Sequence, residues 1–421
     1  MPNGMLPRVV PAVIRQHAED ASFLHAVRTR LTAARHIKLN ELRRFDDRLA
    51  AHLDGLSVAG VHAWSHCAAA LSAPTPSAVF AAAVLAIERK EPERLNHLYA
   101  LVEAVPEARS GLVSAFGWVD QHQLRGIVAG LLASSNSFQR LMGVKVCAIH
   151  RVGARLRDAT LKASDPVLHA RAIRASGELG QLEQLPACLR ALDEESLETR
   201  FWATWSAVML GNRGVALEAL TNLSEIPKSL NMRAFHLALQ AMDQESAHAW
   251  LRQLGQNPEN VRLLVQGSGI AGVSTYVPWL IRQMSDLKIA RLAGEAFSLI
   301  TGLDLAQGDL KRNPPEGGGA GPNDDPNDPR VAMDEDDGLP WPDSERITSW
   351  WEANGDRFIP GTRYFLGAPI TRENALRVLK EGFQRQRILA AHYLCLLEPG
   401  TVLFEWRAPA ARQQRLLAAM G

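Results

Sequence analysis

The amino-acid sequence predicts an all-α fold in which helix pairs stack into an α-solenoid. Between residues 106 and 303, short amphipathic segments are separated by Gly, Asn, Asp and Ser, and almost no strand-like alternation of apolar and polar residues occurs. Arginine also recurs there with successive spacings of 31, 31, 29, 33, 29 and 29 residues. A period near 30 residues is typical of stacked helix pairs. The recurring positions are Arg109, Arg140, Arg171, Arg200, Arg233, Arg262 and Arg291.

The first part of the chain, residues 1–105, is helical in pattern but does not keep this period. Its clearest helix is expected over residues 39–60, where Gly55 offers a helix end and charged residues lie opposite an apolar face. Terminal units of a solenoid must differ from internal ones, because one of their faces meets water. We therefore expect residues 1–105 to form an N-terminal helical cap. The apolar face of residues 39–60 consists of Leu42, Phe45, Leu49 and Leu53.

Polar residues precede several of the recurring arginines at a nearly constant distance. Asp165, Glu194 and Ser285 stand six residues before an arginine, and Asn257 stands five residues before one. Polar side chains at these positions are expected to cap the N-termini of the arginine-bearing helices.

The segments before these helices carry apolar faces and a proline each, Pro186 and Pro278. A capping residue six positions before an arginine, together with proline in the preceding helix, resembles HEAT repeats, particularly the short repeats of phycobilisome-lyase-like proteins. The resemblance implies a solenoid over residues 106–303 whose arginine-bearing helices line a concave face. The expected apolar faces are Leu182, Leu185, Leu189 and Leu192 in one segment, and Val277, Leu280, Ile281 and Met284 in another.

Residues 304–343 are expected to form a flexible acidic insertion. Residues 313–343 contain nine acidic residues, seven Pro and five Gly, a composition that cannot build a core. Two interpretations remain for this insertion: a solvated linker, or an acidic peptide that docks into a basic groove on the chain itself or on a partner. Helical patterns resume afterwards, so residues 344–421 are expected to complete the solenoid. The expected helices cover residues 344–351, 372–380, 384–397 and 408–419.

Composition excludes some classes of partner. The 421 residues are 47% hydrophobic and 22% charged, and 46 basic against 45 acidic residues give a net charge of +1. No global field therefore attracts nucleic acid or an anionic membrane. No apolar run is long enough for a signal peptide or a membrane span, so we expect a cytoplasmic protein. The cysteines are interpreted as small buried hydrophobes in a reducing compartment. They are Cys67, Cys147, Cys188 and Cys395.

Two motifs suggest ligands, but neither has the required context. The sequence GSGIAG over residues 267–272 matches the dinucleotide-binding GxGxxG pattern, but no strand precedes it, so close helix packing is the preferred interpretation. His62 and His66 share a helical face, but Ala63 stands where a zinc protease needs Glu. No nucleophile elbow, phosphate-binding loop or carboxylate pair is recognisable. The sequence therefore predicts no catalytic, cofactor or metal residues and a non-enzymatic role.

The stretch WWEANGDRFIPGTRYFLG, residues 350–367, has two possible roles. Trp350 and Trp351 can bury apolar area where the chain returns to the last repeat. Together with Arg363 they can instead form the centre of a protein interface, where Trp and Arg are enriched. Both interpretations stay open at the level of sequence.

Stretches at both ends resemble one family. LNELRRFDDRLAAHLDGLSVAG near the start, and LPWPDSERITSWW and QRQRILAAHYLCLLEPGTVLFEWRAPAARQQRLL near the end, are similar to a family of bacterial HEAT-like proteins encoded in type VI secretion effector clusters. The resemblance implies a protein partner and, as the first hypothesis, an immunity protein that neutralises a co-encoded effector toxin. An effector chaperone or adaptor is the alternative, and a lyase-like HEAT enzyme a more distant one.

A nuclease toxin would offer a basic groove to the acidic insertion, and complementary charge would steer the two proteins together. No direct nucleic-acid or membrane partner is expected. The candidate acidic contacts are Asp324, Asp325, Asp328, Asp334, Glu335, Asp336 and Asp337.

Overall fold

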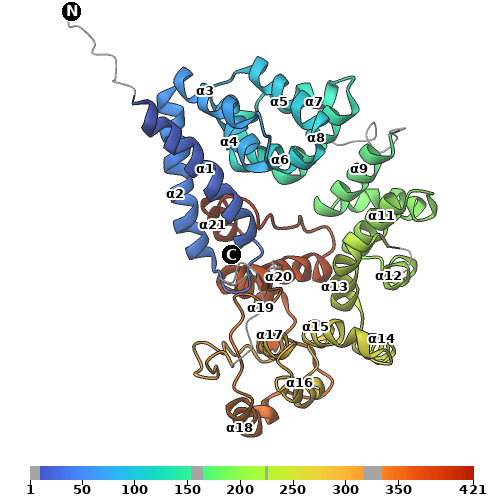
Figure 1. The fold of residues 1–421 in the computed structure, drawn as a ribbon. Coiled ribbons are helices and arrows are strands. Elements are labelled where there is room, and N and C mark those ends of the chain that lie inside the picture. Colours follow the sequence, from blue (N-terminus) through green and yellow to red (C-terminus); the bar gives the residue numbers. More distant parts are fainter. Residues whose placement is uncertain (1–9, 153–164, 223–225, 316–333) are drawn as a thin grey trace, which may run out of the picture. The chain divides into compact units, whose positions relative to one another are not determined.

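The computed structural model of the chain describes residues 10–152, 165–222, 226–315 and 334–421 (Figure 1). These residues are mostly helical. The strands described are β1 (Tyr364–Phe365) and β2 (Ala368–Pro369), which pair antiparallel in a short hairpin. The predicted all-α class is therefore confirmed, while the stacking of helix pairs into a solenoid stays a prediction. Over the described ranges, no helix is both long and apolar enough to cross a membrane.

The chain divides into two compact units. The first unit comprises residues 1–206, 383–385 and 400–421, and the second comprises residues 207–382 and 386–399. Each unit therefore combines one long continuous stretch with short segments from the C-terminal part of the chain.

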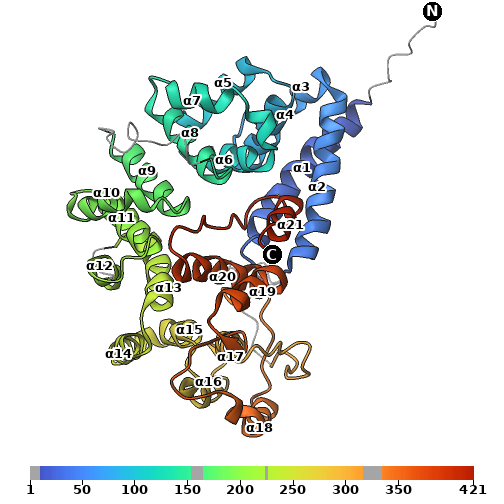
Figure 2. The ribbon, with the colours of Figure 1, turned by 180° about the vertical axis from the view of Figure 1, so that it is seen from behind.

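The first unit begins with a hairpin of two long helices, α1 (Pro11–Leu31) and α2 (Leu39–Ala59), which lie side by side (Figures 1 and 2). The prediction that Gly55 ends α2 is wrong, because the helix continues to Gly60, where φ is 61°. A Cβ atom at Gly55 would lie 2.7 Å from Nε2 of His17. Gly55 thus allows the imidazole of α1 to approach α2, which a sequence pattern within α2 cannot reveal.

The core of this unit surrounds α4 (Pro76–Glu88), in which every residue from Ala78 to Ile87 is buried. A helix that is apolar on all sides must be covered on all sides, and α4 contacts α1, α2, α3, α5 and α6. The remaining helices of the unit include α3 (Val61–Ala70), α5 (Pro92–Ala104), η1 (Pro106–Ala108), α6 (Arg109–Trp118), η2 (Gln121–Leu124), α7 (Ile127–Ala133), α8 (Ser137–Ile149), α9 (Pro166–Glu178), η4 (Leu182–Gln184), α10 (Leu185–Arg190), η5 (Ala191–Asp193) and α21 (Ala410–Ala418).

The contact between α4 and α6 depends on Gly111. A Cβ atom there would lie 1.8 Å from the carbonyl oxygen of Pro76, a backbone atom that cannot rotate away. We expect Gly111→Ala to lower the free energy of unfolding by about 2 kcal/mol, because α6 must shift from α4. Urea unfolding measures this loss. Gly130→Ala is the matched helical control, since a Cβ at Gly130 meets nothing within 4 Å; equal effects of the two substitutions would contradict the prediction.

The second unit consists largely of helix pairs. Helix α13 packs against α15, and α15 packs against α17; α12, α14 and α16 contact α13, α15 and α17 respectively. The recurring Arg233, Arg262 and Arg291 fall on α13, α15 and α17, so the sequence period matches successive neighbouring helices here. The bounds are α12 (Val215–Thr221), η7 (Lys228–Leu230), α13 (Asn231–Ala241), α14 (Gln244–Leu254), η8 (Pro258–Asn260), α15 (Val261–Ala271), η9 (Ser274–Tyr276), α16 (Val277–Gln283) and α17 (Ala290–Thr301).

The expected helix caps are partly confirmed. Asp165 accepts hydrogen bonds from the first amides of α9, and Asn257 accepts one at the start of η8. Glu194 does not cap a helix; it contacts Nε2 of His169 at 2.9 Å. Ser285 donates to a preceding carbonyl instead. Both predictions are wrong because the next helices, α11 (Leu197–Met209) and α17, begin several residues later.

The predicted apolar face of α16 is confirmed, because all four of its residues are buried. The prediction of a leucine face in residues 182–192 is wrong, because Leu182 is 48% exposed and the buried residues are Cys188 and Ala191. This segment is broken into η4, α10 and η5, so one helical period does not run through it.

The four C-terminal helices lie where the sequence places them. Helix α20 contacts α13 and α15: the Gln240 amide donates to the Leu389 carbonyl at 2.9 Å, and the Tyr393 hydroxyl donates to the Ile270 carbonyl at 3.2 Å. The face of α13 that carries Gln240 is thus occupied by the chain itself. The bounds are α18 (Ser344–Asn354), η10 (Gly355–Arg357), α19 (Arg372–Glu381) and α20 (Gln384–Leu397), with α21 in the first unit.

Candidate interaction site

The end of the acidic insertion is held on two of the recurring arginines of the second unit. Arg291 donates to the Asp334 carboxylate and, at 3.2 Å, to the Asp336 carbonyl. Arg262 donates to both carboxylate oxygens of Asp336, at 2.5 and 3.0 Å, and its Nε lies 3.0 Å from Glu335. Asp336 is only 3% exposed. For these residues the structure supports docking on the chain itself rather than a solvated linker.

The flanks of the insertion are packed because they carry apolar residues. The Asp343 amide donates to the Leu310 carbonyl at 2.8 Å, and the Arg312 amide donates to the Trp341 carbonyl at 2.9 Å. Trp341 is buried beneath the Arg291 guanidinium, which lies 4.7 Å from the ring centroid. Residues 304–315 and 334–343 are therefore part of the folded second unit, although the sequence predicted a flexible insertion over 304–343.

The four acids of the turn at residues 334–337 differ in how far they are buried, and Glu335 pairs with Arg262 from an exposed position. Asp334 and Asp336 face the arginines, whereas the Glu335 side chain is 79% exposed and Asp337 is exposed. Burial alone would lower the pKa of Arg262, but the carboxylates of Asp336 and Glu335 outweigh it and raise the pKa. Arg262 thus stays charged and holds the turn at residues 334–337 in place, with exposed acidic side chains on its outer side.

Two predicted interface residues, Trp350 and Trp351, are half-buried on α18 and pack inside the second unit. Trp350 meets Phe297 edge to face at 5.8 Å between ring centroids, and Trp351 lies 5.4 Å from Phe358. These contacts agree with the packing interpretation. The remaining acidic candidates Asp324, Asp325 and Asp328 lie outside the described residues.

Arg363, the third member of the predicted interface centre, is engaged by backbone carbonyls. Its guanidinium donates to Leu239 and Met242 at the end of α13, at 2.7 and 2.5 Å. It also donates to Ala271 and Ile270 at the end of α15, at 2.8 and 3.4 Å. Helix C-termini leave carbonyls without intrahelical partners and favour a positive charge. Arg363 therefore joins the ends of α13 and α15.

The GSGIAG motif lies within α15, as the packing interpretation requires. A Cβ atom at Gly267 would lie 2.7 Å from the Phe235 ring, and one at Gly269 would lie 2.8 Å from Cα of Ala296. Gly272 ends the helix in the left-handed conformation, with φ at 70°. Close helix packing or helix termination thus explains why glycine is present at each of these positions, without a bound nucleotide.

The histidine pair lies on α3, with His62 exposed and His66 half-buried. Among the described residues, no cluster of three or more His, Cys, Asp or Glu side chains is placed to hold a metal ion. All four cysteines are buried thiols, as predicted. Burial raises the pKa of Cys67 to about 11 and that of Cys188 to about 12, so neither is a ready nucleophile.

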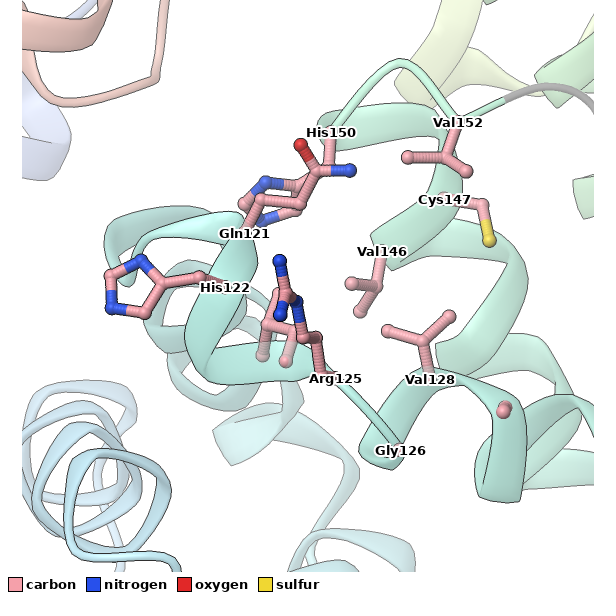
Figure 3. Close-up of a pocket in the computed structure, with 11 residues that line it drawn as sticks. Gln121, His122, Arg125, Gly126, Val128, Val146, Cys147, His150 and Val152 are labelled. Carbon is pink, nitrogen blue, oxygen red and sulfur yellow. The ribbon is translucent and has the colours of Figure 1, made fainter.

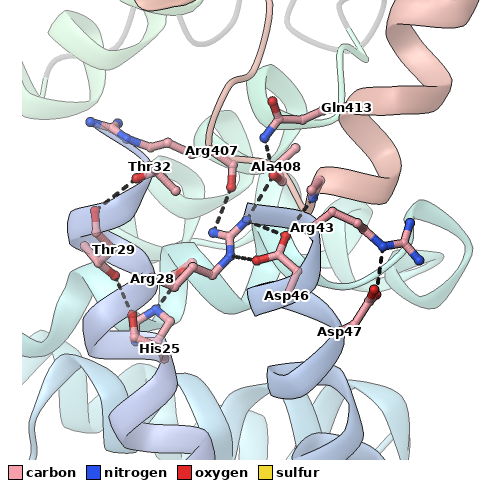
Figure 4. A network of polar contacts seen from close by, with 12 residues as sticks. His25, Arg28, Thr29, Thr32, Arg43, Asp46, Asp47, Arg407, Ala408 and Gln413 are labelled. Atoms are coloured by element: carbon pink, nitrogen blue, oxygen red, sulfur yellow. Dashed lines mark hydrogen bonds and ion pairs between the residues drawn. The ribbon is translucent and has the colours of Figure 1, made fainter. Parts of the chain in front are cut away.

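Sequence patterns did not reveal the buried ion pair in Figure 4, which fastens the C-terminal chain to the α1–α2 hairpin. Arg28 donates to both carboxylate oxygens of Asp46, at 2.7 and 3.2 Å. It also donates to the carbonyls of Arg407 and Ala408, each at 3.0 Å. Asp46 in turn accepts from the Ala410 amide at 2.7 Å, at the start of α21. No local spacing signals a contact between such distant segments.

Sequence patterns also missed a cavity of about 480 Å³ in the first unit, between η2, α7 and α8 (Figure 3). Charged and polar side chains line one part of it and valines line another. None of its residues stands in a recognisable motif.

Comparison of the chain with known protein families, curated proteins and solved structures finds no match.

Proposed function

We propose that the chain is a non-enzymatic protein-binding scaffold that recognises a basic partner through its anchored acidic turn. The observation that carries the proposal is that some acids of residues 334–337 bind arginines of the chain and others are exposed. Asp334 and Asp336 are fixed to Arg291 and Arg262, and Glu335 also pairs with Arg262 at 3.0 Å although its side chain is 79% exposed. Asp337 faces solvent and contacts neither arginine. Fixing the turn before binding lowers the entropy cost of association, and exposed carboxylates steer a positively charged partner towards it.

The identity of the partner rests on the family resemblance of the terminal stretches. That resemblance supports an immunity protein that binds and neutralises a co-encoded type VI secretion effector toxin in the cytoplasm. A nuclease toxin fits this role best, because its substrate groove must be basic to bind nucleic acid.

The test is co-purification of the chain with the product of the adjacent effector-like gene, followed by an assay of effector activity with and without the chain. We expect a stable complex in which the activity is lost. We expect Asp337→Lys to weaken the complex about tenfold, mainly through slower association that depends on salt. Asp337 contacts neither anchoring arginine; within the described part of the chain, its carboxylate accepts only from the amide of Gly338, at 2.9 Å.

Glu352→Lys on α18 is the matched control, because it reverses another exposed acid of the same unit. Equal affinities of the Asp337 and Glu352 variants would contradict the acidic turn as the binding surface. A stable complex with full effector activity would contradict the immunity role and favour a chaperone or adaptor.

A further inference from the structure

The cavity in the first unit has the dimensions of a small-molecule site. Its volume of about 480 Å³ falls within the range of roughly 300–1,000 Å³ that is typical of ligand pockets. It is bounded by η2, by the turn at Gly126 into α7 and by the second half of α8. All of these elements belong to the first unit, so the cavity is a feature of one compact body.

One part of the cavity is apolar. Val128 of α7 and Val146 of α8 face each other across it, and Val152 lies at the end of the same part (Figure 3). Leu124, which is buried, also lines the cavity. This wall suits the apolar body of a ligand and offers it no hydrogen bond.

The other part of the cavity carries polar and charged side chains. Arg125 forms no hydrogen bond or ion pair with the described residues, and its guanidinium lies between Gln121 and the valines in Figure 3. The neighbouring acid, Asp120, instead faces Arg412 and Arg415, at 3.8 and 3.6 Å. The positive charge of Arg125 is therefore not neutralised by that carboxylate.

His150 also lines the cavity. Its Nε2 lies 2.8 Å from the Phe116 carbonyl, which can only accept, so Nε2 carries the proton and Nδ1 carries a lone pair. Burial lowers the pKa of His150 and outweighs the hydrogen bond to the Phe116 carbonyl, which raises it, so the net shift favours the neutral ring. The cavity thus offers a charged planar donor, Arg125, next to an apolar wall.

We propose that this cavity binds a small carboxylic acid, with the carboxylate on Arg125 and an aliphatic body against Val128, Val146 and Val152. A guanidinium matches a carboxylate with two parallel hydrogen bonds. The valine wall selects a hydrocarbon body and disfavours a compact, fully hydrated anion. This site is independent of the acidic turn, which lies in the other unit.

The test uses octanoate, octan-1-ol and octylamine as probes of equal chain length, titrated into the intact chain and followed by ligand-detected NMR. We expect octanoate to bind and octan-1-ol to bind about tenfold more weakly, because the alcohol loses a charge-assisted hydrogen bond. Octylamine should not compete with octanoate, since its ammonium faces Arg125. Equal binding of octanoate and octan-1-ol would overturn the proposal.

Two substitutions at exposed positions of the cavity test its location. Arg125→Gln removes the charge, and Ala129→Trp fills the space without altering a buried residue. Each is expected to weaken octanoate binding at least tenfold, while Arg30→Gln, an exposed arginine on α1, leaves it unchanged. Unchanged binding in either cavity variant, or an equal loss in the Arg30 variant, would overturn the proposed site. Urea unfolding of each variant verifies that the chain is folded.

Discussion

Replacing Asp46 with Asn is expected to lower the free energy of unfolding by about 3 to 5 kcal/mol, because it leaves the buried Arg28 without a counter-charge. The two side chains are only 5% and 6% exposed, so water cannot replace the lost carboxylate. The substitution also weakens the acceptor of the Ala410 amide at the start of α21. Urea unfolding followed by circular dichroism measures the loss.

The adjacent Asp47 provides the control for this prediction. Asp47 pairs with Arg43 one helical turn away, but both side chains are largely solvated, at 57% and 40% exposed. Exposed pairs of this kind contribute about 0.3 to 0.5 kcal/mol, so Asp47→Asn should be almost neutral. A cost of less than about 1 kcal/mol for Asp46→Asn would contradict the assignment of Arg28 and Asp46 as a buried pair that needs both partners.

A second readout separates loss of the ion pair from general loosening of the unit. Arg28 reaches the carbonyls of Arg407 and Ala408, so Asp46→Asn should also release the segment that leads into α21. Limited proteolysis is expected to cut the variant near residue 407 before it cuts α4, whose residues are buried throughout. Cleavage at equal rates in both places would indicate global unfolding instead.

Local features of the fold were predictable from the sequence because they depend on neighbours along the chain. Helix α20 has the predicted bounds, and Asp165 caps α9 as expected, since both follow from residue periodicity and the preference for short acceptors at helix starts. Gly55 is a residue whose role could not be predicted from its neighbours along the chain. Its role is set by His17, on another helix, and a glycine in the sequence does not indicate which neighbour will approach it.

The candidate site was predictable in composition but not in geometry. The sequence indicates an acidic segment, and it indicates arginines that recur on successive helices. It does not indicate that Asp336 meets Arg262, 74 residues earlier, because the pairing depends on how the chain returns after α17. Which acids face inward at the turn, and which remain for a partner, follows only from that long-range contact.

Replacing Arg363 with Gln is expected to lower the free energy of unfolding by about 3 kcal/mol, because four carbonyls at the ends of α13 and α15 lose a charged donor. Glutamine is too short and has too few donors to reach both helix ends. Lysine keeps the charge but carries all its donors on one nitrogen, so it cannot reach both helix ends at once. Arg363→Lys should therefore recover about half of the lost free energy of unfolding. Urea unfolding of the three proteins measures the series.

Arg357 supplies the matched control, since it is exposed on η10 and has a single contact of 3.4 Å to Asn354. Arg357→Gln should change the free energy of unfolding by less than about 0.5 kcal/mol.

The same variants distinguish the two interpretations of the 350–367 stretch. An internal role for Arg363 requires that Arg363→Gln lose stability yet retain affinity for the partner at temperatures where it is folded. Unchanged stability with lost affinity would instead make Arg363 the centre of a protein interface, because its guanidinium would then have to leave the carbonyls of α13 and α15 at little cost.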